Sequence, residues 1–184
     1  MLNGQRIIDM HAHTNAPPEL YAYKSGLLSS RGYPGKGNPG ISDERLEEAT
    51  LRGLAIMDKV GTDMQFLSPR PFQLMHSEKP AKIVHWWNEA NNDVIGRVFK
   101  AHPDRYAGVC GLPHISDEKD SSHVVPELER CVNDLGFIGC MINPDPGEGE
   151  SYTPPLDDEY WYPLYESMVK LNVPALIHSA GCKD

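Results

Sequence analysis

The 184-residue sequence lacks a basic segment dense enough to bind a nucleic acid. Its 17 Lys and Arg residues are outnumbered by 26 Asp and Glu residues, and the formal net charge is -9 at pH 7. Binding to the phosphate backbone depends on clustered positive charge, so this balance argues against a nucleic-acid partner. A small substrate or another protein is the expected partner instead.

The chain also lacks a long hydrophobic run and a dense set of cysteines. No apolar segment approaches the roughly 20 residues that a membrane span needs, and the first residues do not resemble a signal peptide. The four cysteines, Cys110, Cys131, Cys140 and Cys182, have neither CxxC spacing nor the density of a disulfide scaffold. We therefore expect reduced, mostly buried thiols in a cytoplasmic protein without a membrane partner.

Short apolar runs alternate with amphipathic segments along the chain. The apolar runs predict strands near residues 6–10, 64–67, 106–112, 137–142 and 174–178. The amphipathic segments predict helices over residues 42–61, 80–101, 122–135 and 157–171. The segment from Thr14 to Gly40 is crowded with Pro, Gly, Tyr and Ser, and we expect an irregular functional insert there, a lid or an interface.

This βα alternation predicts one α/β domain, residues 1–184, with a parallel sheet. Five strands and four helices fit either an open doubly wound sheet or part of a (β/α)8 barrel. The first strand is followed by His11-Ala12-His13-Thr14 and not by a glycine-rich phosphate loop, which weakens the doubly wound alternative. We therefore expect a partial TIM-like barrel with about five βα units.

The strongest functional signal is the HxH dyad formed by His11 and His13. Alternate side chains of a strand share a face, so both imidazoles are expected to project together while Ala12 turns away. Neutral imidazole suits zinc and other late divalent ions, and a catalytic site takes three protein ligands. His178 follows the fifth strand at the same sheet edge and is the predicted third ligand. The alternatives are that the dyad is a surface feature and that His178 only caps the barrel.

Two further residues are candidates for binding an anionic substrate. Arg70 follows the second strand between two prolines, and a guanidinium can hold a carboxylate through two parallel hydrogen bonds. Asn143 follows the fourth strand, and its amide can donate or accept toward a ligand. A plain surface arginine is the alternative for Arg70. Asp145 is expected to brace the turn, and Asp9 to face away from the dyad and to bond the backbone or orient a ligand.

The remaining histidines and the tryptophan pair are expected to be structural. His114 follows the third strand and is a reserve candidate for the mouth of the barrel, although a loop role is preferred. Trp86 and Trp87 are expected to pack against the barrel. The histidines expected in helices or connections are His76, His85, His102 and His123.

Longer motifs accompany the histidines. They are Gly136-Phe137-Ile138-Gly139, Asn143-Pro144-Asp145-Pro146, Pro154-Pro155-Leu156 and Trp161-Tyr162-Pro163. With HxH in the first strand and a histidine after the fifth, the chain resembles the amidohydrolase superfamily of metal-dependent (β/α)8 barrels, in its branch of decarboxylases and hydratases of aromatic breakdown. The resemblance implies that His11, His13 and His178 hold a divalent ion, zinc or alternatively manganese, and that Arg70 and Asn143 seat substrate carboxylates.

The resemblance implies a lyase that adds water to an unsaturated polycarboxylate. A non-oxidative decarboxylase and a hydrolase of the same superfamily are alternatives, and an inactive remnant or a binding protein is the alternative of another class. The superfamily's strands six to eight are missing, so we expect an N-terminal fragment that binds metal weakly alone, with the general base in the absent part. Its open sheet edges predict pairing with another chain and a homo-oligomer.

Overall fold

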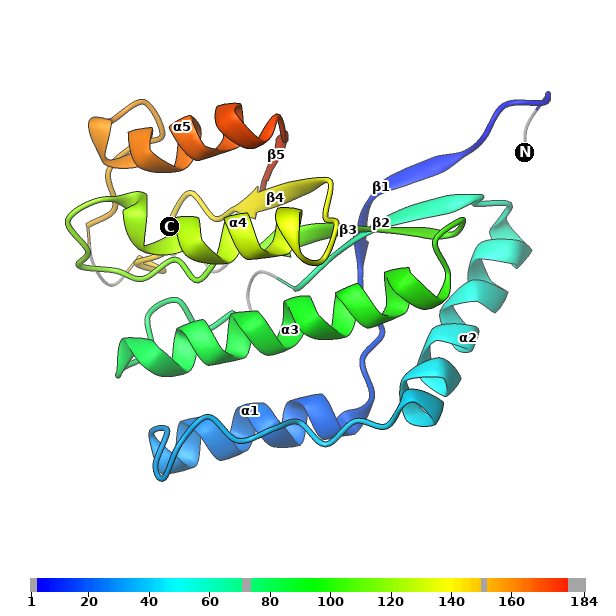
Figure 1. The fold of residues 1–184 in the computed structure, drawn as a ribbon, viewed down its shortest axis with the longest axis horizontal. Coiled ribbons are helices and arrows are strands. Elements are labelled where there is room, and N and C mark those ends of the chain that lie inside the picture. The colour runs from blue at the N-terminus through cyan, green and yellow to red at the C-terminus, as the bar shows by residue number, and fades with distance from the viewer. Residues whose placement is uncertain (1–2, 71–73, 150–151, 179–184) are drawn as a thin grey trace.

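A computed structural model describes residues 3–70, 74–149 and 152–178 of the chain. In these residues, five parallel strands form one sheet in the order β1-β2-β3-β4-β5 (Figure 1). The strands are β1 (Ile8–His13), β2 (Met64–Ser68), β3 (Tyr106–Gly111), β4 (Gly139–Ile142) and β5 (Ala175–Ile177).

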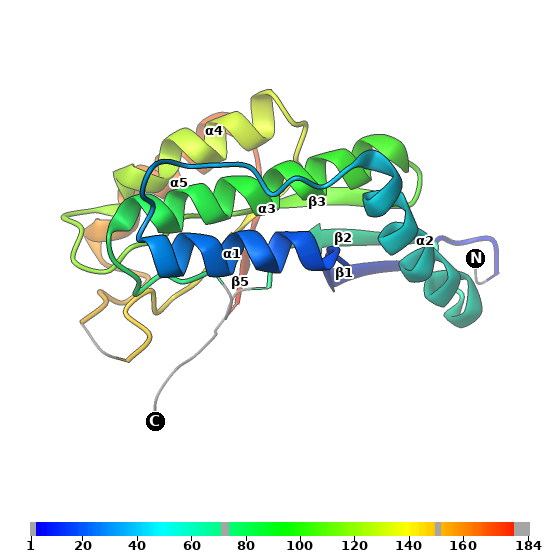
Figure 2. The same ribbon diagram turned by 90° about the horizontal axis from the view of Figure 1, so that it is seen from below.

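The helices follow the outer side of the curled sheet (Figures 1 and 2). They are α1 (Pro18–Ser30), α2 (Asp43–Val60), α3 (Ala81–Ala101), α4 (Val125–Asn133) and α5 (Tyr162–Leu171), with short 3-10 helices η2 (Ser121–Val124) and η3 (Glu159–Trp161). Within the described ranges, none of the helices combines the length and the apolar character that crossing a bilayer requires.

The strand order decides between the two predicted sheet types. Each strand pairs with the next one along the chain, so every crossover moves in the same direction. Right-handed crossovers that all move in one direction place all their helices on one face, whereas a doubly wound sheet reverses direction and covers both faces. The expectation of a partial (β/α)8 barrel is therefore confirmed.

Helix α3 forms the centre of the core between the sheet and the outer helices. Its side chains Ile83, Trp87 and Ile95 are at most 1% exposed, and the helix packs along β3. Burial of each such side chain stabilises the fold by about 1.5–3 kcal/mol. The predicted packing of Trp87 is thus confirmed, and Trp86 lies partly buried against the same core.

The composition predicts an irregular segment between Thr14 and Gly40, but part of this segment is helical. Residues Pro18–Ser30 form the 13-residue helix α1, which begins with Pro18 in its first turn and buries Leu20 and Leu27. Prolines in the first turn of a helix are tolerated because the first N–H groups have no intrahelical partner. The helix was missed because its apolar residues show almost no helical periodicity, and packing against α3 stabilises it instead.

Strand β1 carries one extra residue relative to β2. Asp9 pairs with Gln65 and Ala12 pairs with Leu67, so three steps along β1 match two along β2. Gln65 and Leu67 share one face of β2, and therefore Asp9 and Ala12 share the corresponding face of β1. Strict alternation would have put Asp9 on the same face as the HxH dyad. The extra residue turns it away, as expected for Asp9.

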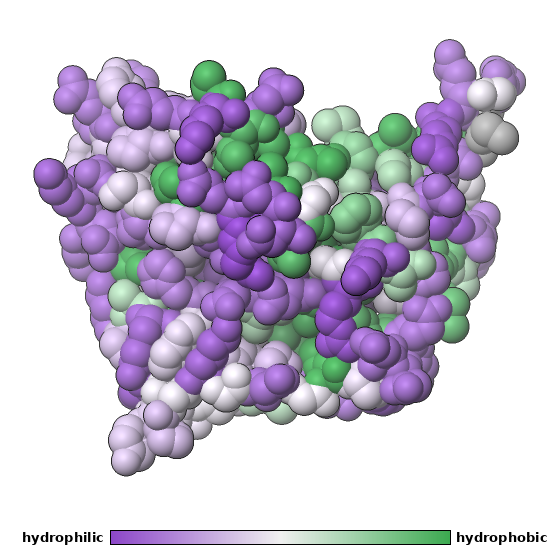
Figure 3. All heavy atoms as spheres, in the orientation of Figure 1, coloured by the Kyte–Doolittle hydropathy of each residue, from purple (hydrophilic) through white to green (hydrophobic). Residues whose placement is uncertain are grey.

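The helix-covered face is largely hydrophilic, with some hydrophobic side chains among the polar ones (Figure 3). The two edge strands also carry exposed large apolar side chains. Met10 of β1 is 67% exposed and Ile177 of β5 is 59% exposed. These edges have no strand neighbour among the described residues.

Candidate metal centre

Three imidazoles converge at the carboxyl ends of β1 and β5. We call His11, His13 and His178 the histidine triad; one potential ligand atom from each lies within 4.8 Å of the others. The ring centroid of His11 lies 5.2 Å from that of His13 and 4.6 Å from that of His178. The centroids of His13 and His178 are 5.6 Å apart. Nε2 of His11 is 2.8 Å from Nε2 of His178. The structure therefore brings together the three histidines that the sequence predicted.

The curl of the sheet makes this convergence possible. β1 and β5 are the two edges of the five-stranded sheet. In a flat sheet, four steps of about 4.8 Å would separate them by roughly 19 Å. Their terminal histidines instead have centroids 4.6 Å apart, because the sheet bends into part of a barrel.

Ser68 at the end of β2 determines which nitrogen of His13 is free. Its Oγ donates to the carbonyl oxygen of Ala12 at 3.3 Å and lies 3.1 Å from Nδ1 of His13. Since the single hydroxyl proton goes to the carbonyl, the hydroxyl accepts from His13 Nδ1–H. This hydrogen-bond network leaves a lone pair on Nε2 of His13, which can bind a cation.

The surroundings of His13 favour its neutral form. Burial of the ring lowers its pKa below the usual range, and the charge of His11 lowers it further. The Ser68 contact opposes this, whereas His178 and Arg70 act in the same direction as burial. A neutral imidazole is the form that binds a metal ion.

Arg70 lies close to this centre but is exposed. Its charge contributes to the lowered pKa of His13, and no hydrogen bond or ion pair engages it within the described residues. An unpaired guanidinium near the triad is available to an anion. Pro71, one of the prolines expected to stiffen it, lies outside the described residues.

Asn143 is placed beside the triad by the pairing of β4 with β5. Ile142 pairs with Ile177, so Asn143 follows directly next to His178. The side chain is 1% exposed, and Oδ1 accepts from the Asp145 N–H at 3.1 Å. Its Nδ2 is buried and has no hydrogen-bond partner among the residues that the structure describes. A free amide donor therefore lies at the end of β4.

Asp145 and Asp9 have the supporting contacts expected of them. Asp145 Oδ1 accepts from the hydroxyl of Thr153 within the connection after β4. Asp9 Oδ1 accepts from the His11 N–H at 3.1 Å, and Oδ2 accepts from the side chain of Gln65 at 3.0 Å. Asp9 thus fixes the backbone of the HxH dyad from the opposite face.

The other histidines lie outside the triad. His102 lies 2.9 Å from a carboxylate oxygen of Glu47, and His123 contacts the carbonyl of Asp120. His76 and His114 are fully buried next to each other. Cys110, Cys131 and Cys140 are buried free thiols, as expected, and Cys182 lies outside the described residues.

Ser68 is the supporting residue that sequence reasoning missed. The relevant signal is the pairing of His13 with Ser68 across β1 and β2. That pairing depends on the extra residue in β1, which no sequence pattern indicates. The serine therefore looked like an ordinary strand end in the sequence.

The triad fits a divalent cation by the chemistry of its donors. A tetrahedral zinc ion with bonds of about 2.0–2.1 Å requires ligand nitrogens about 3.3 Å apart. The observed 2.8 Å between His11 and His178 comes within small ring rotations of that value. His11 is exposed, so one side of the centre is open to water or to a substrate.

The chain has clear similarity to known proteins. It is 41% identical over 179 residues to 2-keto-4-carboxy-3-hexenedioate hydratase of Sphingobium sp. (strain NBRC 103272 / SYK-6), covering 95% of this chain and 52% of that protein. The crystal structure of 4-oxalomesaconate hydratase from Rhodopseudomonas palustris superposes with a TM-score of 0.85 at 34% identity, over 94% of this chain and 52% of that one.

A third similarity concerns the fold alone. Dihydroxybenzoic acid decarboxylase from Polaromonas sp. JS666, solved with bound manganese and an inhibitor, has a TM-score of 0.64 at 24% identity over 96% of this chain and 50% of that one. The chain thus spans about half the length of these relatives. Residues 8–182 match the amidohydrolase family, and the chain belongs to that family.

Proposed function

We propose that this chain is the metal-binding part of a hydratase that adds water to the double bond of an unsaturated polycarboxylate. The convergence of the histidine triad carries the proposal, because three imidazoles with an open side suit a catalytic cation. The similarity to two hydratases over nearly the whole chain supports this reaction over the others of the family.

His11, His13 and His178 would hold the ion, with zinc as the first candidate and manganese as the second. A bound divalent ion supplies positive charge that polarises water or a carboxylate oxygen. The imidazole donors suit zinc, and the decarboxylase relative contains manganese. The three histidine rings would fix the position of the ion, and the Ser68 hydroxyl holds the ring of His13.

Arg70 and Asn143 would seat the carboxylates of the substrate. Among the described residues nothing pairs with the exposed guanidinium near the triad, and the Asn143 amide offers a buried donor beside His178. Together they supply donors on two sides of the centre, which suits a substrate with more than one carboxylate. We assign no general base to the described residues.

A non-oxidative decarboxylase is the second candidate. The decarboxylase relative shares the fold, and a cation with a nearby arginine can also hold an aromatic carboxylate. Assays of 4-oxalomesaconate hydration and of dihydroxybenzoic acid decarboxylation distinguish the two reactions. A cytoplasmic location and a homo-oligomeric state stay predictions.

Calorimetric titration of the chain with zinc tests the metal centre. We expect one ion per chain. The His178→Ala variant should lose more zinc affinity than the roughly 10- to 100-fold that is typical when only a hydrogen-bond partner of a ligand is removed. His85→Ala is the matched control, because His85 is half-buried on α3 outside the triad. Equal zinc affinity of the His178→Ala variant and the unaltered chain would refute the assignment.

A further inference from the structure

A second pair of histidines lies buried in the connections that follow β2 and β3. His76 and His114 are both 0% exposed, and their ring centroids are 5.7 Å apart. The ring of His114 also packs edge-on against Trp161, with centroids 5.5 Å apart. Neither histidine belongs to the triad, and the proposed function gives neither a role.

The hydrogen bond of His76 fixes its tautomer. Its Nδ1 lies 2.9 Å from the carbonyl oxygen of His114. A carbonyl oxygen only accepts, so Nδ1 carries the proton and the neutral ring has its lone pair on Nε2. Burial lowers the pKa of His76 to about 4, which keeps the ring neutral. Nε2 is buried, and nothing among the described residues bonds it.

His114 has two such nitrogens. Both Nδ1 and Nε2 are buried, and neither has a hydrogen-bond partner in the described part of the chain. Burial holds the pKa of this ring well below its usual range, so the ring is neutral and offers one N–H donor and one lone pair. The pair therefore presents one donor and two acceptors that no described residue satisfies.

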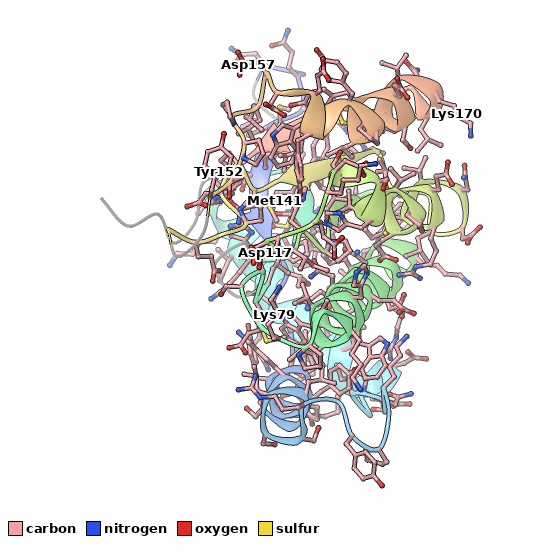
Figure 4. The ribbon with its side chains drawn as sticks, turned by 90° about the vertical axis from the view of Figure 1, so that its left-hand side faces the viewer. Lys79, Asp117, Met141, Tyr152, Asp157 and Lys170 are labelled. Carbon is pink, nitrogen blue, oxygen red and sulfur yellow. The ribbon has the colours of Figure 1, made fainter. Side chains whose placement is uncertain are left out.

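The backbone indicates that the position of His76 is maintained at a cost. Met75, directly before it, has φ of 63° although it is not a glycine, and it is only 6% exposed. A methionine in the left-handed region is strained, and it keeps this conformation only where its surroundings hold it there. Lys79 in the same connection also bonds the Ser116 carbonyl and pairs with Asp117 at 3.4 Å (Figure 4). The two connections are thus joined at several points.

We propose that one ordered water molecule bridges Nε2 of His76 and a ring nitrogen of His114. Buried polar groups in native proteins are almost always bonded, and ordered water satisfies those that the protein leaves unpaired. Water donates to the Nε2 lone pair and accepts from the His114 N–H. His76 then ties the connection after β2 to the connection after β3 through both of its ring nitrogens. This proposal does not depend on the proposed function.

The variant His114→Phe gives a test by the sign of a stability change. Phenylalanine keeps a ring against Trp161 but removes both nitrogens. If a water molecule bonds the two histidines, the variant removes a hydrogen-bond partner of that water and leaves Nε2 of His76 poorly satisfied. The midpoint of thermal unfolding then falls by roughly 3 °C or more. If they are truly unpaired, the variant removes an unsatisfied group, and the midpoint rises. An unchanged or higher midpoint overturns the proposal.

Direct observation separates a lost water from poor packing of the new ring. A high-resolution crystal structure of the unaltered chain should show a density peak within about 3.2 Å of both nitrogens. Nitrogen-15 NMR should show protonated Nδ1 and bare Nε2 for His76, in the unaltered chain and in a His85→Phe control. Absence of the peak, or a proton on Nε2 of His76, refutes the bridge whatever the unfolding result.

Discussion

For two histidines, His13 and His76, a single hydrogen bond determines which ring nitrogen keeps its lone pair. The Ser68 hydroxyl accepts a hydrogen bond from Nδ1–H of His13, and the carbonyl of His114 accepts one from Nδ1–H of His76. In both rings Nε2 keeps its lone pair. The two rings differ in what surrounds that lone pair, since His13 faces two other histidines whereas His76 is sealed in the interior.

The variant Ser68→Ala should weaken metal binding by about 10- to 100-fold, because His13 loses the acceptor that holds its orientation and tautomer. Isothermal titration with zinc measures the change. Ser29→Ala on α1 is the control, since the Ser29 hydroxyl bonds only the Gly26 carbonyl of its own helix. An affinity equal to that of the control would show that Ser68 does not support the ligand.

Acid should destabilise the chain through His76. Its pKa in the folded chain is about 4, below the ordinary value of 6.5, so the unfolded chain binds more protons between these values. The contribution of His76 to stability is therefore complete above pH 6.5 and is lost as the pH falls to about 4, at most about 3 kcal/mol.

The variant His76→Asn checks this contribution, because asparagine keeps a donor near the Nδ1 position but does not titrate. Urea unfolding at about pH 5 and about pH 7 should show a smaller fall in the free energy of unfolding for the variant than for the unaltered chain. The same fall in both proteins would contradict the assignment of the acid sensitivity to His76.

Helices were predictable where capping signals and periodic apolar residues agree. α2 begins after Ser42, whose Oγ accepts from the Arg45 N–H at 3.3 Å, and it ends at Gly61 with φ of 79°. Both features follow from residue chemistry, since serine caps orphan N–H groups and glycine tolerates a positive φ. α1 has neither a capping side chain nor a periodic apolar face, so only its packing reveals it.

The variant Leu20→Ala should destabilise the chain by about 2–5 kcal/mol, because Leu20 of α1 is 1% exposed and its removal leaves a cavity. Leu51→Ala on α2 is the matched control, because that leucine is 52% exposed and should change stability by less than about 1 kcal/mol. Denaturant unfolding measures both variants. Equal effects would mean that α1 contributes little to the fold.

At the scale of the whole molecule, the curl of the sheet creates the candidate site, and the open sheet leaves two edges among the described residues. The curl brings His11 and His178 together, and apolar side chains such as Met10 and Ile177 are accessible on the edge strands β1 and β5. An exposed strand edge with apolar side chains is a template for pairing with another chain.

The chain should therefore associate with itself as its concentration rises. Sedimentation velocity should show a shift to larger species, and the double variant Met10→Lys with Ile177→Lys should reduce it, because charge on an edge opposes pairing. Val169→Lys is the control, since Val169 is 81% exposed on helix α5 and does not belong to an edge strand. A single monomeric species at every concentration would refute the expectation.

The residues themselves determined the alternation of strands and helices, the thiols of the core and the identity of the triad. Apolar runs set the strands, and histidines spaced two apart in a regular strand are expected to share a face. The same reasoning predicts Arg70 and Asn143 as substrate-binding candidates, because polar side chains at the carboxyl ends of parallel strands meet at one edge.

Only the tertiary structure decided the rest. It formed α1 by packing, turned Asp9 away through an extra residue in β1, and placed Ser68 behind His13. It also buried His76 against His114, which the sequence had presented as ordinary loop residues. These outcomes depend on contacts between segments far apart in the chain, whereas sequence patterns report the preferences of neighbouring residues.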